Sequence, residues 1–208
     1  MSGVFITLEG GDGAGKSTQS SLLAAWLREA GREVVTTREP GGTELGVEIR
    51  HLVQHRRGHV APRAEALLYA ADRAHHVATL VRPALERGAV VLQDRYLDSS
   101  IAYQGAGRVL GADEVRELSL WAADGLLPDL TVLLDLDPEE GRRRMASRAD
   151  APYDRLEAAP DDFHARVRRQ YLALAASEPA RFLVVDAAAD PDAIHARVRE
   201  GVAGLLEA

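Results

Sequence analysis

Apolar residues along the chain follow two patterns, short continuous runs and longer stretches with helical spacing. The short runs are rich in valine and leucine, which is typical of strands that are buried on both faces. We expect five strands, at residues 4–9, 32–39, 89–94, 130–137 and 181–187. The stretches with helical spacing lie between them, at residues 17–30, 43–53, 62–86, 113–123, 138–147, 161–177 and 191–206.

Strands and helices therefore alternate, and this order predicts an α/β fold. We expect a doubly wound, five-stranded parallel sheet with helices on both faces. No repeat or linker interrupts the chain, which predicts a single domain over residues 1–208. The glycine-rich stretch 104–113 is interpreted as a loop, with Asp113 as the cap of the helix that follows. The polar stretch 149–160 is interpreted as part of a short mobile lid at about residues 142–160.

A glycine-rich segment follows the first predicted strand and leads into the first predicted helix. Its residues Gly10, Gly15, Lys16 and Ser17 match the pattern G-x-x-x-x-G-K-[ST]. Glycines let consecutive backbone N–H groups face one anion, and the helix N-terminus adds positive potential. We therefore expect a P-loop NTPase fold, with Ser17 as a ligand of Mg²⁺. The residues expected to bind the donor nucleotide here are Gly10, Gly11, Asp12, Gly13, Ala14, Gly15, Lys16, Ser17 and Thr18.

Lys16 is the only lysine of the chain, although lysine and arginine together number 25. An ammonium group is a compact charge on a long stem, so it can reach phosphates from inside the loop. A guanidinium group is planar and has a fixed geometry. This contrast predicts that Lys16 binds phosphate in a space shaped for an ammonium group.

Composition narrows the possible partners. The formal net charge of −7 gives no sign of general affinity for nucleic acid or for an anionic membrane. The chain has no cysteine, so disulfides and thiolate metal sites are excluded. No stretch approaches the roughly 20 apolar residues of a membrane-spanning helix, and the first residues lack the features of a signal peptide. We expect a cytoplasmic protein with small-molecule substrates, and neither nucleic acid nor a membrane as a partner.

The P-loop motif is shared by GTPases, motor ATPases and small-molecule kinases, so it does not identify the function by itself. A GTPase usually has an Asn-Lys-x-Asp motif, and the single lysine is already part of the P-loop. No second strand ends in paired Asp-Glu, which weakens the case for a motor ATPase. Many arginines follow the predicted strands, at the edge where open α/β sheets bind ligands. Such a positive field favours phosphoryl transfer.

Five segments follow one another along the chain: EGGDGAGKST, TREPGGT, YAADRAHH, DRYLDSSIAYQGAGR and DRLE. In this order they resemble the motifs of the thymidylate kinase family, and the resemblance covers essentially the whole chain. It implies transfer of the γ-phosphoryl group from ATP to dTMP, which yields dTDP for dTTP synthesis, with Mg²⁺ as the cofactor. It also implies a homodimer whose helices pack across a two-fold axis.

The resemblance implies roles for acidic and basic residues near the transferred phosphoryl group. Arg95 would lie between the donor and acceptor phosphates, and Asp94 would support the metal or its waters. On the residues alone, a surface salt bridge of this Asp-Arg pair was the alternative. Asp12 would lie near the sugar 3′-hydroxyl and the metal, and Glu157 at the metal or the ribose. Lys16, Arg95 and Asp12 are thus implied as catalytic residues.

The resemblance also implies where the acceptor phosphate and base bind. Arg38 would bind the acceptor monophosphate, and Pro40 predicts a rigid turn that a cis peptide bond could form. Tyr69 and Arg73 are four residues apart and share one helix face. Tyr69 would stack on thymine, in a place where the family usually has phenylalanine, and Arg73 would donate to thymine O4. An aromatic residue at helical spacing is also typical of a hydrophobic core.

Four further residues of the acceptor site follow the Asp-Arg-Tyr motif. Ser100 and Gln104 would read the base, with Ser99 in the same dTMP-binding set. Tyr103 would lie beside the ribose 2′-carbon, where its ring would exclude a 2′-hydroxyl group. A polar loop with one buried tyrosine was the alternative for this stretch.

Arginines cluster in the predicted lid, at Arg142, Arg143, Arg144, Arg148 and Arg155. One subclass of the family has a basic residue in the P-loop, and another supplies it from the lid. None of the variable loop positions 11–14 is basic here. The resemblance therefore implies that Arg148 or Arg155 acts on the transferred phosphoryl group, as arginine fingers do. Arg142 or Arg143 is a candidate for stacking on adenine, although the run 142–144 is also typical of a solvent-exposed helix face.

Two alternatives to this function remain open from the sequence. The acceptor could be another nucleotide or a deoxynucleoside. The protein could instead be a P-loop switch or regulatory ATPase, which would hydrolyse nucleotide slowly and would not be accelerated by dTMP.

Overall fold

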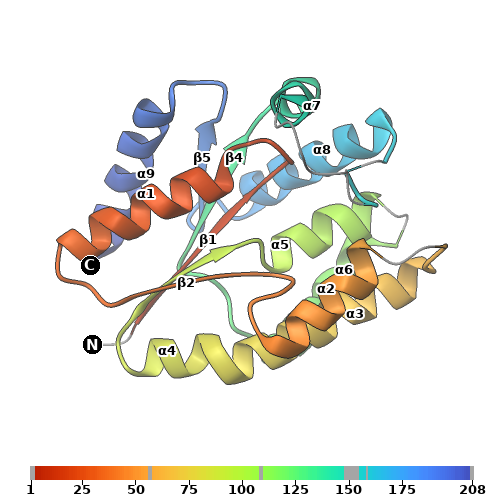
Figure 1. Cartoon of the computed structure of the whole chain (residues 1–208), viewed down its shortest axis with the longest axis horizontal. Coiled ribbons are helices and arrows are strands. Elements are labelled where there is room, and N and C mark those ends of the chain that lie inside the picture. Colours follow the sequence, from red (N-terminus) through yellow and green to blue (C-terminus); the bar gives the residue numbers. More distant parts are fainter. Residues whose placement is uncertain (1–2, 56–57, 108–109, 148–154, 158, 207–208) are drawn as a thin grey trace.

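A five-stranded sheet forms the centre of the computed structural model, which describes residues 3–55, 58–107, 110–147, 155–157 and 159–206 (Figure 1). The strands are β1 (Val4–Gly10), β2 (Val34–Arg38), β3 (Val90–Asp94), β4 (Leu130–Asp135) and β5 (Phe182–Asp186). All are parallel, in the order β2-β3-β1-β4-β5, with Val4 of β1 paired to Val90 and Ile6 to Leu130. The predicted five-stranded parallel sheet is confirmed.

Helices cover both faces of this sheet. Their bounds are α1 (Lys16–Glu29), α2 (Glu44–Gln54), α3 (Pro62–His76), α4 (Arg82–Glu86), α5 (Leu97–Ser100), α6 (Ala112–Ala122), α7 (Pro138–Ala146), α8 (Asp161–Ser177) and α9 (Pro191–Leu206). α1 and α9 pack on each other and on one face, whereas α4, α5 and α8 contact the other face, beside α3 and α6. The doubly wound arrangement is therefore confirmed. None of the described helices is long and apolar enough to cross a bilayer.

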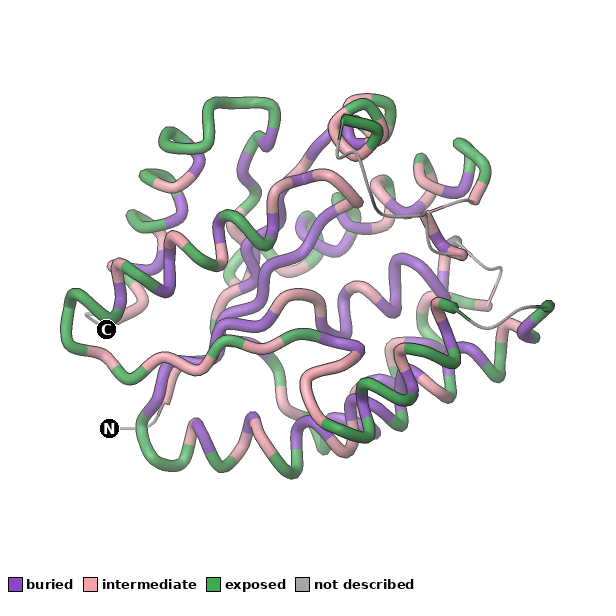
Figure 2. Tube along the Cα trace, viewed as in Figure 1, coloured by how far each residue is buried: buried purple, intermediate pink, exposed green. Residues whose placement is uncertain are grey.

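The continuous apolar runs are explained by two hydrophobic cores, one on each face of the sheet. Because successive side chains of a strand point to opposite faces, Phe5 and Ile6 enter different cores. Phe5 packs with Val91 and Leu133 under α3, α4, α5, α6 and α8, and Ile6 packs with side chains of α1 and α9. The central strands are accordingly buried along most of their length (Figure 2).

The stretch 62–86 is helical throughout, as predicted, but it is not one regular α-helix. A π-helical segment, η1 (Val77–Val81), separates α3 from α4. Pro83 follows at the start of α4. Proline has no N–H to donate and its ring crowds the preceding turn, which accounts for a wider turn just before it.

The predicted loop at 104–113 was wrong in its first part. Residues Ile101–Gly107 form a second π-helical segment, η2, which continues α5. Ile101 to Gln104 are all buried, and η2 packs against α6 and α8. Tertiary packing thus overrides the low helix propensity of the glycines. Asp113 is not the cap of the next helix, because α6 begins at Ala112 with Gly111 as its N-cap and Asp113 lies in its first turn.

Candidate functional site

The P-loop lies at the carboxyl end of β1 and leads directly into α1. Gly10, Gly13 and Gly15 have positive φ angles of 136°, 76° and 93°, which side chains with a Cβ rarely adopt. A Cβ on Gly10 would also lie 2.4 Å from the carbonyl oxygen of Leu134. The glycines are therefore needed for the curl that turns backbone N–H groups toward an anion.

Lys16 occupies the space inside this curl. Its ammonium Nζ donates to the carbonyl oxygens of Gly10 at 3.1 Å and Gly11 at 2.8 Å. Burial, with the positive charge of Arg95, lowers the pKa of Lys16, while Asp94 and Asp12 act in the opposite direction. Both hydrogen-bond acceptors are neutral, so the charge is available to a phosphate group.

The P-loop is in close contact with α7, which the sequence analysis did not anticipate. A Cβ on Gly13 would lie 2.4 Å from the carbonyl oxygen of Gly141, and a Cβ on Gly141 would lie 2.4 Å from that of Asp12. Two glycines therefore allow the two backbones to touch. This contact fixes α7, and with it Arg142, beside the loop that would bind the donor nucleotide. The signal in the sequence was the lone glycine inside a predicted helix.

Ser17 and Asp94 lie together beside the P-loop. The Ser17 hydroxyl donates to Asp94 Oδ2 at 3.4 Å, and Asp94 closes β3. Asp94 Oδ1 is buried and has no hydrogen-bond partner among the described residues. A hydroxyl and an unsatisfied carboxylate oxygen next to a phosphate site are the oxygen ligands that Mg²⁺, or its waters, prefer. These two residues fit the predicted metal.

Arg95 lies at the centre of the site, directly after β3. Its backbone has a positive φ of 66°, which is uncommon for a residue with a side chain. Its guanidinium donates to Gly10 O at 3.1 Å, Asp12 Oδ1 at 2.6 Å, Ser99 Oγ at 3.2 Å and the hydroxyls of Tyr103 and Tyr171 at 3.2 and 3.3 Å. Tyr103 also donates to Asp12 Oδ2 at 3.1 Å. The structure thus brings the predicted residues Asp12, Arg95, Ser99 and Tyr103 into one network.

This network contains charges that stay ionised despite burial. Burial alone would raise the pKa of Asp12, but Arg95 and Lys16 hold it below its usual value. Burial likewise works against the charge of Arg95, yet Tyr103 and Asp12 raise its pKa. Arg95 therefore remains a cation, positioned by hydrogen bonds from several elements.

Glu9 and Tyr171 support Arg95 and were missed by the sequence analysis. Glu9 accepts from the backbone N–H of Tyr96 at 2.7 Å, from Ser99 Oγ at 2.6 Å and from the Tyr171 hydroxyl at 2.9 Å. Burial, with the negative charge of Asp98, raises the pKa of Glu9 to about 7. The signal was an acid at the end of an otherwise apolar strand. No local pattern indicated Tyr171, because it reaches the site from the middle of α8.

A cavity, called the base cavity below, opens on the other side of Arg95, between α3, α5 and η2. Tyr69, Arg73, Ser100 and Gln104 line it, as predicted for the base, together with Pro40. The Glu39–Pro40 peptide bond is cis. Tyr69 is also part of the hydrophobic core, as is typical of an aromatic residue at helical spacing, and its stacking on thymine stays a prediction.

Arg73 is held in place by a buried ion pair. It donates to Glu39 Oε2 at 3.0 Å, to Ser119 Oγ at 3.1 Å and to Ser100 Oγ at 3.1 Å. Glu39 also pairs with His76 Nδ1 at 3.0 Å. Glu39 and Ser119 were not predicted. Glu39 lies in the TREPGGT segment, where only Arg38 and Pro40 were given roles, and Ser119 belongs to none of the quoted motifs.

Asp72 lies beside this buried pair and also escaped prediction. Burial, with the negative charge of Glu39, raises the pKa of Asp72 to about 6. Its Oδ1 accepts from the backbone N–H of Gly41 at 3.5 Å. It thereby ties α3 to the turn that follows β2.

Arg155 lies on the acceptor side of the site. Its guanidinium donates to the carbonyl oxygen of Val53 at the end of α2 and forms an ion pair with Glu65. Glu65 in turn accepts from Gln104 Nε2 at 2.9 Å. The structure therefore does not bring Arg155 to Lys16. The predicted Arg148 lies outside the described residues.

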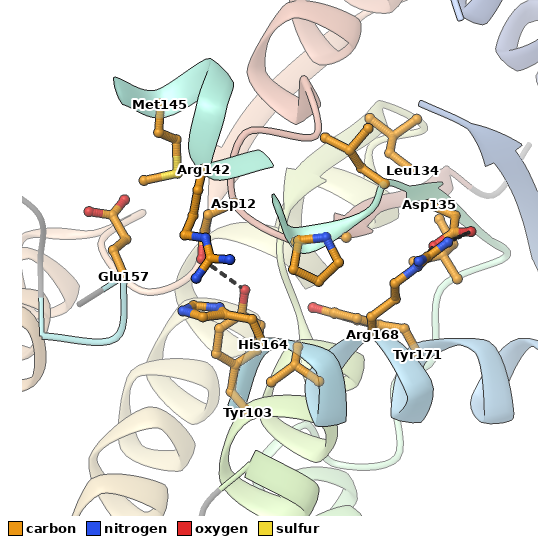
Figure 3. Close-up of a pocket in the computed structure, with 16 residues that line it drawn as sticks. Asp12, Tyr103, Leu134, Asp135, Arg142, Met145, Glu157, His164, Arg168 and Tyr171 are labelled. Carbon is orange, nitrogen blue, oxygen red and sulfur yellow. Dashed lines mark hydrogen bonds and ion pairs between the residues drawn. The ribbon is translucent and has the colours of Figure 1, made fainter. Parts of the chain in front are cut away.

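Another cavity lies between the P-loop, α7 and α8 (Figure 3). Arg142 and Met145 reach it from α7, and Glu157 lies on the same side. Arg142 forms an ion pair with Asp161. Arg143 instead pairs with Glu140 on the exposed surface, at 2.7 Å.

The largest space in the site lies over the P-loop and has a volume of about 290 Å³. Its lining includes Lys16, Ser17, Arg38, Asp94 and Glu157, which come from four different segments. Asp12 and Arg95 line both this space and the base cavity. The two compartments therefore meet at Arg95.

A P-loop beside a second, side-chain-lined cavity, on a parallel sheet of order 2-3-1-4-5, indicates a P-loop protein that binds a nucleotide next to a second ligand. Comparison with known proteins agrees. The model of the thymidylate kinase family matches residues 8–198. The chain belongs to the thymidylate kinase family and has the phosphotransferase activity of that family.

Relatives match over nearly the full length. A thymidylate kinase of Clavibacter michiganensis subsp. michiganensis is 70% identical over 208 residues, 100% of this chain and 98% of that protein. One of Leifsonia xyli subsp. xyli is 73% identical over 197 residues, 95% and 93% of the two chains. The crystal structure of thymidylate kinase from Ehrlichia chaffeensis superposes with a TM-score of 0.78 at 32% identity, over 97% of this chain and 99% of that one.

Proposed function

We propose that this chain transfers the γ-phosphoryl group of ATP to the 5′-phosphate of dTMP, with the two nucleotides bound in the compartments that meet at Arg95. The observation that carries the proposal is this junction. ATP would place its phosphates over the P-loop, and dTMP would place its base between Tyr69 and Arg73. The acceptor is already a phosphate anion, so no side chain has to act as a strong base.

Three cations would bind the reacting phosphates. Lys16 would contact the β- and γ-phosphates from inside the loop, and Arg38 would bind the acceptor phosphate from the end of β2. Arg95 would lie between them. Catalysis of phosphoryl transfer depends mainly on positioning and charge neutralisation, and a cation held by Asp12, Ser99 and Gly10 is rigid enough for both.

Ser17 and Asp94 would hold Mg²⁺ or its water ligands. A magnesium ion bound with ATP supplies positive charge to the β- and γ-phosphate oxygens. Asp12 is a weaker metal candidate, because both of its carboxylate oxygens are used by Arg95 and Tyr103. Glu157 lines all three cavities and stays a candidate for the metal or the ribose.

Tyr103 would give the preference for a deoxyribose. Its ring is buried and makes edge-to-face contacts with Phe163 and Tyr171, with centroid separations of 5.9 and 6.4 Å. Its hydroxyl is also fixed on Asp12. A ring that cannot move would clash with a 2′-hydroxyl group, and Asp12 would remain near the 3′-hydroxyl.

Arg142 is the best-placed candidate for contact with ATP outside the P-loop, because α7 is fixed against Gly13 and Arg142 lines the cavity there. Whether Arg148 or Arg155 acts on the transferred phosphoryl group stays a prediction. Arg155 would have to leave Glu65 to do so.

A homodimer would use the face made by α2, α3 and α6. α3 contacts both α2 and α6, and the three helices carry exposed apolar side chains such as Leu45, Leu67 and Trp121, the last two 58% and 81% exposed. The mass measured by light scattering should be that of two chains, and Leu67→Asp should reduce it to one. The expected cytoplasmic location stays a prediction.

A coupled assay of ADP formation tests the reaction. We expect rapid turnover with ATP, magnesium and dTMP, and slower turnover with dUMP, UMP, dCMP or thymidine. Greater turnover of another acceptor would replace dTMP as the substrate. Nucleotide hydrolysis that dTMP does not accelerate would contradict the proposal altogether.

A further inference from the structure

Gln104 lies at the boundary between the base cavity and the protein interior. It belongs to the buried segment η2 and is 1% exposed, yet it lines the cavity with Arg73 and Ser100. Its amide nitrogen Nε2 donates to Glu65 Oε1 at 2.9 Å. In the described part of the chain no other hydrogen bond is recorded for this amide group. One end of the amide is therefore fixed, and the other is left for a ligand.

Glu65 lies behind Gln104 and is fully buried in the first turn of α3. It does not line the base cavity. Its two carboxylate oxygens have different partners, since Oε1 accepts from Gln104 and Oε2 pairs with Arg155 Nη2. A buried carboxylate needs such a counter-charge. The carboxylate of this ion pair can only accept hydrogen bonds.

The orientation of the Gln104 amide follows from this pairing. An amide offers an N–H₂ donor at one end and a carbonyl acceptor at the other. Because Glu65 can only accept, it holds the N–H₂ end and leaves Oε1 as the acceptor for the cavity. The Arg155 guanidinium has donors only. The atom of residue 65 that faces it, at the position of Glu65 Oε2, must therefore be an acceptor.

We propose that Glu65 is a specificity-determining positioning residue, which turns the carbonyl of Gln104 toward the base and so selects pyrimidines that carry a hydrogen on N3. The inference rests on the proposed binding of dTMP in this cavity. Thymine and uracil have an N3–H that such a carbonyl accepts. Cytosine has a bare N3 acceptor, which would face the carbonyl unpaired.

Glu65→Gln tests this with almost no change in shape. Arg155 would hold the new amide oxygen at the Oε2 position, so the new N–H₂ would face Gln104 and turn its amide around. We expect the ratio of kcat/KM for dTMP to that for dCMP to fall about tenfold or more, the size of one hydrogen bond lost or gained. The ratio for dTMP to dUMP should not change, because both bases carry N3–H.

Repeating the Glu65→Gln substitution in a Gln104→Met variant separates an effect that acts through Gln104 from a general disturbance of the site. The double variant should have the same ratio of kcat/KM for dTMP to kcat/KM for dCMP as Gln104→Met alone. A further shift of that ratio would overturn the proposal. An equal loss for dTMP, dUMP and dCMP in the single Glu65→Gln variant would also overturn it.

Folding and the underlying reaction are checked separately. Thermal unfolding and the KM for ATP report whether a variant is intact. If Glu65→Gln does not fold, Glu65→Asp keeps the charge for Arg155 and withdraws the acceptor from Gln104. It should lower the same ratio by a smaller factor, and an unchanged ratio would contradict the inference. Absence of dTMP phosphorylation by the unaltered protein would instead remove the proposed function.

Discussion

The two halves of the site are built in different ways. The P-loop is a run of consecutive residues whose backbone forms the binding surface, and its lysine is held by neutral carbonyl oxygens. The base cavity is lined by side chains from the turn after β2 and from α3, α5 and η2, among others, and its arginine is held by a buried carboxylate. An anion needs only N–H groups and positive charge, whereas a base needs hydrogen-bonding groups at defined positions.

The positive charges of Lys16 and Arg73 also differ in the partners that already bind them. Among the described residues, no carboxylate is in hydrogen-bonding contact with Lys16, so a phosphate can become its main partner. Arg73 is already paired with Glu39 and supported by Ser100 and Ser119. It is therefore suited to orienting a neutral base rather than to neutralising a reacting group. The following substitutions test this contrast, beginning with the largest expected effect.

Lys16→Arg should lower kcat by at least about 100-fold, the range seen when one preorganised charge is removed from a transition state. The space between the Gly10 and Gly11 carbonyls accommodates an ammonium group, and a guanidinium would have to leave it. Lys16→Met is the matched comparison. Similar losses in single-turnover transfer are expected, and full activity of the arginine variant would show that shape is unimportant there.

Arg73→Lys should raise the KM for dTMP by about 100-fold and leave the KM for ATP nearly unchanged. A lysine keeps the charge but cannot contact Glu39, Ser100 and Ser119 together. Leaving a buried carboxylate poorly paired should also reduce the free energy of unfolding, by about 3 kcal/mol. Substrate titrations and urea unfolding measure the two effects, and equal changes in both KM values would argue against a separate acceptor site.

The pH dependence of stability tests the buried acid beneath Arg95. Because the pKa of Glu9 is raised to about 7 from its ordinary 4.5, the folded state binds more protons than the unfolded state between these values. Its contribution to stability is full below pH 4.5 and is lost as the pH rises through 7.

Glu9→Gln should therefore flatten this dependence, by an amount on the order of 2 kcal/mol. Urea unfolding of both proteins at pH 5, 6, 7 and 8 measures it. Parallel curves for the two proteins would show that Glu9 titrates normally.

Gly141→Ala should weaken ATP binding, with the KM for ATP raised about tenfold and the KM for dTMP little changed. The added Cβ would meet the Asp12 carbonyl at 2.4 Å, so α7 and the P-loop would have to separate. The tenfold figure corresponds to about 1.4 kcal/mol of the overpacking cost. Gly204→Ala, where nothing lies within 4 Å of the new Cβ, is the control and should have normal KM values.

Arg142→Ala should have the smallest effect, a rise of about threefold in the KM for ATP, in line with a partly exposed cation near a base. Arg143→Ala is the matched control, because that side chain is exposed and pairs with Glu140. A larger effect for Arg143 than for Arg142 would reverse the choice of adenine contact. Titrations with ATP at saturating dTMP distinguish them.

Local patterns predicted much of this molecule because the physics behind them is local. Continuous apolar runs identified the central strands β1, β3 and β4, since a strand covered on both faces has no polar side. The glycines and the single lysine identified the phosphate site, since consecutive residues form the backbone curl that binds phosphate. The segment η2 and the true start of α6 were not predicted, because packing around Tyr103 depends on neighbours elsewhere in the fold.

The sequence by itself determined the strand-and-helix order, the P-loop and the set of residues expected to contact each nucleotide. Tertiary structure alone decided which of these residues support one another: Glu9 and Tyr171 behind Arg95, Glu39 behind Arg73, and Glu65 behind Gln104. The physical reason is that a buried polar group must find its partner in space. For these groups the partners come from distant segments, so the spacing of residues along the chain does not indicate which of them form hydrogen bonds.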